Sequence, residues 1–199
     1  VYLTVNMIYL VRLEPVSHEL DDPPFVSVCV PARDEERSIL ACLKSLLEQD
    51  YPKFEVIVVN DHSTDHTGDL IHELAGKNSR LIPLDGEDLP KGWLGKPFAL
   101  HQAFQKAKGE ILLFTDADPI FEPNALQTAV FTMQERNLDA LTLMPKAEFG
   151  SFWEKAVQPV IFGFIGSLTR FGKVNSHDQK SAMGFGAFLM FKRSAYEAI

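Results

Sequence analysis

The chain has 199 residues, 46% of them hydrophobic, and a net charge of −8. This length and composition suit one folded α/β domain with a sizeable core and exclude a disordered chain. The negative charge and the lack of a Lys/Arg-rich stripe exclude a general nucleic-acid binder, because nothing would displace counterions from a phosphate backbone.

The first 24 residues are expected to precede the folded domain. Residues 1–13 are largely apolar, and an acidic, Pro-rich linker follows as far as Pro24. Thirteen residues are too few to span a bilayer, so this stretch is either the end of a longer transmembrane helix or an ordinary amphipathic start. We expect residues 1–24 to form the end of a membrane anchor and a linker, and residues 25–199 to form the folded domain.

Short β-branched runs alternate with helical patterns along the rest of the chain. Strands are predicted at 25–31, 54–59, 81–84, 110–114 and 140–145, and helices at 39–47, 67–75, 96–107 and 123–136. This alternation predicts an α/β fold with a mostly parallel sheet and right-handed crossovers.

Two further features have alternative interpretations. The apolar segment 157–171 is either an interfacial or acceptor-side helix or a buried core helix. Cys29 and Cys42 lie in apolar surroundings without C-x-x-C spacing, which favours buried free thiols and a reducing compartment over a disulfide or a zinc site.

Polar side chains follow the predicted strands at their carboxyl ends, where open α/β sheets bind ligands. Arg33 follows the first strand and could approach a diphosphate beside a helix N-terminus, although a helix cap in a solvated charge cluster explains it equally well. Asp61 follows the second strand and could accept hydrogen bonds from a base or a ribose; an Asx turn or an N-cap for the next helix is the alternative.

The fourth predicted strand runs into Asp116-Ala117-Asp118. Residues i and i+2 of an extended strand lie on one side, so both carboxylates could bind a divalent cation that holds a diphosphate. Turn chemistry at a strand end is the alternative. Upstream, Lys96 begins a helix and could neutralise phosphate charge, while Trp93 is either a stacking platform or a packing anchor.

The order of these motifs resembles a family 2 glycosyltransferase of the GT-A fold. The residues that carry the resemblance are 28–36 (VCVPARDEE), 58–65 (VVNDHSTD), 95–96 (GK) and 115–118 (TDAD). The resemblance covers roughly residues 25–199 and implies a Rossmann-like, mostly parallel sheet flanked by helices. Segment 89–96 (LPKGWLGK) is most similar to the membrane-bound branch that includes hopanoid-biosynthesis-associated and carotenoid glycosyltransferase-like proteins.

The resemblance implies a donor site built from all of these motifs. The residues expected to bind the nucleotide sugar are Pro31, Arg33, Glu35, Asp61, Lys96 and Asp116. Asp61 would bind the uracil or its ribose, and Lys96 would lie near the diphosphate. Asp116 and Asp118 would hold the metal, Mn²⁺ or Mg²⁺. The Gly-rich segment 184–189 would be a strand on the acceptor side.

The implied activity is inverting transfer of a sugar from a nucleotide diphosphate sugar, a UDP-sugar, to a hydroxyl of a lipid or another acceptor. The catalytic base is expected beyond Ile199, with Asp178 and Glu148 as possible stand-ins. The full-length protein is expected at the cell membrane with this domain on the cytoplasmic side. A non-catalytic nucleotide-sugar-binding fragment and a nucleotidyltransferase are the alternatives; the basic Gly-rich loop typical of the latter is missing after the first strand.

Overall fold

The computed structural model describes residue 13 and residues 22–146, 151–168 and 183–198. The chain divides into two compact units. The larger unit, Glu14–Met144 with Phe185–Ile199, contains the sheet and the candidate site. The smaller unit, Val1–Leu13 with Pro145–Gly184, contains helix α6 (Phe152–Leu168).

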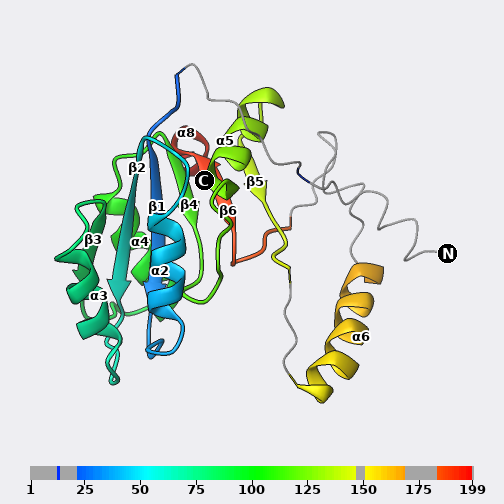
Figure 1. Cartoon of the computed structure of the whole chain (residues 1–199), viewed down its shortest axis with the longest axis horizontal. Helices are drawn as coiled ribbons and strands as arrows, with labels where there is room; N and C mark the ends of the chain where they lie inside the picture. The colour runs from blue at the N-terminus through cyan, green and yellow to red at the C-terminus, as the bar shows by residue number, and fades with distance from the viewer. Residues whose placement is uncertain (1–12, 14–21, 147–150, 169–182, 199) are drawn as a thin grey trace. The chain divides into compact units, whose positions relative to one another are not determined.

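The larger unit is built on a mixed sheet with the strand order β3-β2-β1-β4-β6-β5 (Figure 1). Its elements in chain order are β1 (Val26–Ala32), α2 (Ile39–Leu47), β2 (Phe54–Asn60), α3 (Thr67–Ala75), β3 (Leu81–Asp85), α4 (Gly95–Lys106), β4 (Ile111–Phe114), α5 (Ala125–Glu135), β5 (Ala140–Thr142), β6 (Leu189–Lys192) and α8 (Arg193–Tyr196). Strands β1 to β4 pair in parallel, whereas β6 runs antiparallel to both β4 and β5. The predicted fold class, a mostly parallel sheet flanked by helices, is confirmed.

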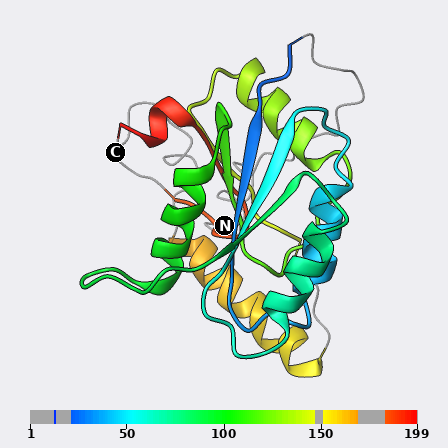
Figure 2. The same cartoon turned by 90° about the vertical axis from the view of Figure 1, so that its left-hand side faces the viewer.

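Alternate residues of the central strands face opposite layers of helices. In β1, Val28 and Val30 belong to the core under α2, α3 and α5, while Cys29 belongs to the core under α4. Figure 2 shows α4 on one side of the sheet and α2 and α3 on the other. Because both faces are covered, these strands are apolar along their whole length, as buried parallel strands are.

The Gly-rich segment 184–189 is not the continuous strand that the sequence predicted. Its residues 185–188 form a tight turn closed by the Phe188 N–H, which donates to the Phe185 carbonyl at 3.1 Å, and β6 begins only at Leu189. The strand predicted at 140–145 is likewise shorter, because β5 ends at Thr142. The other predicted strands and helices match the structure to within a few residues at each end.

Helix α6 begins earlier than the predicted segment 157–171 and exposes large apolar side chains. Phe152, Trp153 and Val160 are 74%, 73% and 70% exposed. The buried-core interpretation is therefore wrong for the described part of this helix, and the interfacial interpretation stays a prediction. Residues 169–171 lie outside the described residues. No helix among the described residues has the length and hydropathy that a membrane span needs.

Candidate donor site

The candidate site lies where the carboxyl ends of β1, β2 and β4 meet the first turn of α4. Asp61 follows β2 directly, and its backbone N–H donates to the carbonyl of Ala32 at the end of β1, at 2.8 Å. Nη1 of the Arg33 guanidinium lies 3.8 Å from Oδ2 of Asp61. The Arg33 side chain is 61% exposed and that of Asp61 only 13%. An exposed cation thus faces a largely buried carboxylate.

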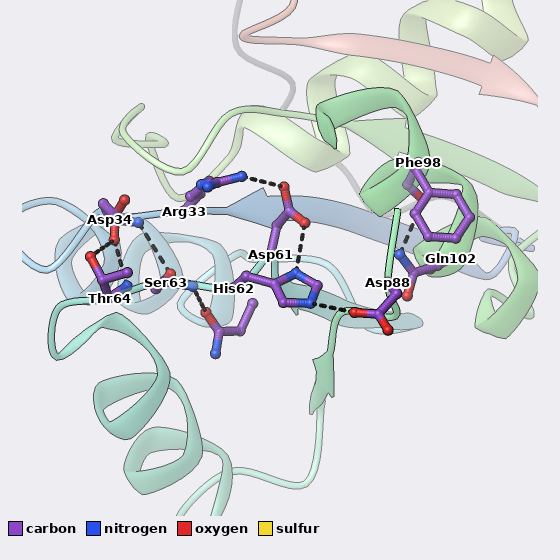
Figure 3. A network of polar contacts seen from close by, with 10 residues as sticks. Arg33, Asp34, Asp61, His62, Ser63, Thr64, Asp88, Phe98 and Gln102 are labelled. Carbon is purple, nitrogen blue, oxygen red and sulfur yellow. Dashed lines mark hydrogen bonds and ion pairs between the residues drawn. The ribbon is translucent and has the colours of Figure 1, made fainter. Parts of the chain in front are cut away.

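The carboxylate of Asp61 is enclosed by backbone. A Cβ added to Gly95 would lie 3.0 Å from Asp61 Oδ2, and one added to Gly86 would lie 3.3 Å from Asp61 Cα. The neighbouring His62, at a positive φ of 57°, places Nδ1 3.4 Å from Asp61 Oδ1 and Nε2 3.7 Å from a carboxylate oxygen of Asp88 (Figure 3). The two glycines therefore let the chain approach Asp61 more closely than a side chain would permit.

The Asx-turn alternative for Asp61 is wrong, because its neighbour makes that contact. Oδ1 of Asn60 accepts a hydrogen bond from the backbone N–H of Ser63 at 3.3 Å. No such local hydrogen bond to backbone involves the Asp61 carboxylate among the contacts of the described residues. Its oxygens therefore face Arg33 and His62 and are available to a ligand.

Lys96 and Asp116 form the second cation–carboxylate pair of the site. Lys96 Nζ donates to Asp116 Oδ1 in a short ion pair, with the two side chains 53% and 33% exposed. The turn at 185–188 lies against this pair, since a Cβ on Gly186 would be 3.6 Å from both Lys96 Nζ and Asp116 Oδ2. The hydroxyl of Thr115 fixes that turn by donating to the Ala187 carbonyl at 2.7 Å.

Asp116 and Asp118 are not part of a strand, because β4 ends at Phe114 and the chain bends. Ala117 is 3% exposed and belongs to the core, while Asp116 is half-buried and Asp118 exposed. The thiol of Cys42 on α2 donates a hydrogen bond to the Asp116 carbonyl at 3.7 Å, which stabilises the backbone of the bend. The backbone here is a bend and not the extended strand end that the sequence predicted, and convergence of the two carboxylates on one cation stays a prediction.

Burial, followed by the nearby negative charges of Asp118, Glu35 and Asp116 in that order, raises the pKa of Cys42 to about 12. Three carboxylates from two loops therefore lie close enough to act on one thiol. Both Cys42 and Cys29 are free and buried, which confirms the prediction of buried thiols. Within the described ranges, no group of three or more His, Cys, Asp or Glu side chains forms a metal site by itself.

The remaining predicted site residues have structural contacts. Pro31 lies half-buried in β1, paired with Val59 of β2. Glu35 Oε2 accepts a hydrogen bond from the Ser38 hydroxyl at 2.6 Å, and its backbone N–H donates to Thr67 Oγ1 at 2.8 Å. Glu35 therefore orders the turn that leads into α2.

A set of hydrogen bonds between the first two loops was not foreseen from the sequence. Asp34 Oδ1 accepts from the backbone N–H of Thr64 at 2.7 Å, while the Asp34 N–H donates to Ser63 Oγ at 3.1 Å (Figure 3). The Glu36 N–H donates to Asp65 Oδ2 at 3.1 Å. No spacing rule predicts these contacts, because they join residues about 30 positions apart.

Trp93 acts as a packing anchor. Its ring lies 5.5 Å from that of Phe98 and 5.0 Å from that of His101, both on α4, although 41% of the residue stays exposed. The possible stand-ins for a catalytic base, Glu148 and Asp178, lie outside the described residues.

A mostly parallel sheet with two cation–carboxylate pairs at its strand ends defines an α/β protein whose charged side chains gather at the edge where open α/β sheets bind ligands. Comparison with known families makes this specific. The chain belongs to the family described as glycosyl transferase family 2, whose profile matches residues 27–199. This confirms the family resemblance and replaces the nucleotidyltransferase alternative.

Two relatives illustrate the sequence similarity. The chain is 35% identical over 127 residues to poly(ribitol-phosphate) beta-N-acetylglucosaminyltransferase TarS of Staphylococcus aureus, covering 62% of this chain and 21% of that protein. It is 32% identical over 136 residues to beta-monoglucosyldiacylglycerol synthase of Nostoc sp., covering 66% of this chain and 29% of that protein. The chain thus spans less than a third of the length of either relative.

Two solved structures are similar in fold. A mannosyltransferase from Pyrobaculum calidifontis in complex with GDP-Man and Mn²⁺ has a TM-score of 0.70 at 24% identity, covering 99% of this chain and 52% of that one. This likeness confirms the GT-A fold. The structure of TarS 1–349 in complex with UDP-GlcNAc has a TM-score of 0.55 at 32% identity, covering 64% of this chain and 36% of that one.

Proposed function

We propose that this chain forms the donor-binding part of a glycosyltransferase that takes a sugar from a UDP-sugar. The observation that carries the proposal is the arrangement of Asp61 with Arg33, and of Lys96 with Asp116, at the carboxyl edge of one sheet. The UDP-GlcNAc held by TarS, a relative with which the chain shares 32% identity in the aligned structure, supports this class of donor.

The chemistry of each group fits one part of such a donor. An ionised carboxylate only accepts hydrogen bonds, so Asp61 suits the N–H of a uracil or the hydroxyls of a ribose. The exposed guanidinium of Arg33 and ammonium of Lys96 suit the diphosphate. When the sugar leaves the diphosphate, negative charge gathers on that group, and fixed cations lower the barrier by stabilising it.

Asp116 and Asp118 would hold the divalent metal, Mn²⁺ or Mg²⁺. Their carboxylates are the hard oxygen ligands that these ions prefer, and both lie on the solvent side of one bend. Two protein ligands suffice where phosphate oxygens of the substrate supply others, which agrees with the lack of a larger cluster among the described residues. A bound metal would offset charge on the leaving diphosphate.

The finer features of the reaction belong to the same proposal. A lipid acceptor is supported by the similarity to beta-monoglucosyldiacylglycerol synthase, and by the exposed apolar side chains of α6. Segment 89–96 supports placement in the membrane-bound branch. We propose inverting transfer, a membrane location with the domain on the cytoplasmic side, residues 1–24 as anchor and linker, and a catalytic base outside the described residues.

Calorimetric titration of UDP tests the donor site directly. We expect UDP to bind more tightly with Mn²⁺ than without it, and Asp118→Ala to lose that gain because it removes a metal ligand. Asp69→Ala, which removes an equal charge from the first turn of α3, is the matched control and should keep the gain. Equal Mn²⁺-dependent binding by Asp118→Ala and wild type would show that Asp118 is no metal ligand.

Release of UDP from a UDP-sugar separates a transferase from a binding module. We expect release by a longer protein that contains this chain and the downstream base. UDP binding without release by that longer protein would instead favour a non-catalytic nucleotide-sugar-binding role.

A further inference from the structure

The ion pair between Lys96 and Asp116 joins two groups that the proposed function gives to different ligands. Asp116 would bind the metal, whereas Lys96 would bind the donor diphosphate. In the structure Lys96 Nζ bonds the Oδ1 of Asp116 itself. Both side chains are partly exposed, at 53% and 33%, so each can be reached by a ligand from solvent.

We propose that Lys96 and the divalent cation compete for Asp116, and that the donor diphosphate ends the competition by drawing Lys96 onto its own oxygens. This inference rests on the proposed function. A carboxylate that already accepts an ammonium hydrogen bond is a poorer metal ligand, because two cations on one carboxylate repel each other. The long, flexible stem of lysine allows its ammonium to move from one anion to another nearby.

The two carboxylates of the bend differ in this respect. Asp116 is paired with Lys96 and lies against the backbone of Gly186, whereas Asp118 is exposed and forms no ion pair among those of the described residues. Competition therefore affects one metal ligand and leaves the other accessible. Metal alone should bind weakly, and nucleotide and metal should raise each other's affinity, since linkage between two ligands is reciprocal.

The size of the effect follows from the exposure of the pair. Ion pairs open to solvent contribute little, and a half-exposed pair such as this one corresponds to a change in affinity on the order of threefold to fivefold. Removing the ammonium should strengthen metal binding by about that factor. Removing a lysine elsewhere on the same helix should not.

Binding of Mn²⁺ alone to the full 199-residue chain tests this, measured by calorimetry without nucleotide. We expect Lys96→Met to bind Mn²⁺ about threefold to fivefold more tightly than wild type. The matched control is Lys106→Met, which removes an equal charge from the exposed last turn of α4, roughly 15 Å along the helix axis. This control should bind Mn²⁺ within about twofold of wild type.

A second substitution shows whether the gain depends on Asp116. Adding Asp116→Asn to Lys96→Met should abolish the gain, because the carboxylate set free by the first change is then missing. Equal Mn²⁺ affinities of Lys96→Met and wild type, or no detectable binding by either, would overturn the inference. A gain that survives Asp116→Asn would also overturn it.

Titration of UDP with Mn²⁺ present separates this inference from the proposed function. If UDP binds to wild type but Lys96→Met shows no gain in Mn²⁺ affinity, only the competition is wrong. If UDP fails to bind to wild type, the proposed function is wrong, whereas a gain of Mn²⁺ affinity in Lys96→Met would still demonstrate competition for Asp116.

Discussion

Substitution of Asp34 tests whether the hydrogen bonds between the β1–α2 and β2–α3 loops stabilise the fold. Asp34 has a φ of 54°, in the left-handed region where Asp and Asn are tolerated better than Ala. Its Oδ1 accepts hydrogen bonds from the backbone N–H and the hydroxyl of Thr64, at 2.7 and 3.2 Å. Arg33 and Asp61, the pair of the proposed donor site that lies 3.8 Å apart, belong to these loops.

Three substitutions at this position should differ in a graded way. Asp34→Asn keeps an acceptor oxygen and the left-handed preference, so we expect a loss of about 0.5 kcal/mol or less in the free energy of unfolding. Asp34→Gly keeps the backbone conformation but loses the side-chain hydrogen bonds, so we expect the free energy of unfolding to fall by about 1 kcal/mol. Asp34→Ala loses the hydrogen bonds and adds about 1 kcal/mol of backbone strain, for a total of about 2 kcal/mol.

Urea unfolding followed by circular dichroism measures these differences, provided that the dependence on urea concentration is equal in all four proteins. The order of stability should be wild type, Asn, Gly, Ala. An alanine variant as stable as the asparagine variant would refute the reasoning, because neither the hydrogen bonds nor the backbone conformation would then matter. A glycine variant less stable than the alanine variant would refute only the backbone strain that we assign to Asp34→Ala.

Three further predictions concern packing and titration. Gly109→Ala should cost about 2 to 3 kcal/mol in thermal unfolding, because its Cβ would lie 2.5 Å from a backbone nitrogen of β1. Burial raises the pKa of Cys29 and Cys42 to about 12, so the free energy of unfolding should fall as pH rises from 9 toward 12, because only the unfolded chain ionises its thiols in that range. Iodoacetamide at about pH 8 should accordingly label both thiols only when urea unfolds the chain. Gly95→Ala should weaken UDP binding about tenfold without unfolding the chain, because its Cβ would press on the Asp61 carboxylate.

The sequence predicted elements well where a single periodicity governed a segment. Helices α2 and α3 begin and end at the predicted residues, because apolar positions recur at helical spacing and recognisable loop residues flank them. The central strands were equally clear, since they are buried on both faces and therefore continuously apolar. The turn at 185–188 was not predictable from the sequence, because glycines between apolar residues suit a bent strand as well as a turn.

The places of the proposed site residues in the fold were predictable one by one, but the contacts between their side chains were not. The carboxyl ends of parallel strands meet at one edge, so Asp61 and the residues after β4 were expected to lie close together. Which cation would meet which carboxylate depends on side-chain reach across loops. Lys96 was expected on the diphosphate, yet it bonds Asp116, which lies 20 residues further along the chain on another element.

The bend at Asp116-Ala117-Asp118 shows what the residue pattern leaves open. Both an extended strand and a bend with a buried centre are compatible with two Asp residues around one Ala, so the pattern alone does not distinguish them. In the structure the bend is fixed by Ala117, which is 3% exposed, and by the hydrogen bond from Cys42 to the Asp116 carbonyl. The geometry of the proposed metal ligands therefore depends on how α2 packs beneath the bend, and substitutions in that buried layer should alter metal affinity without touching either carboxylate.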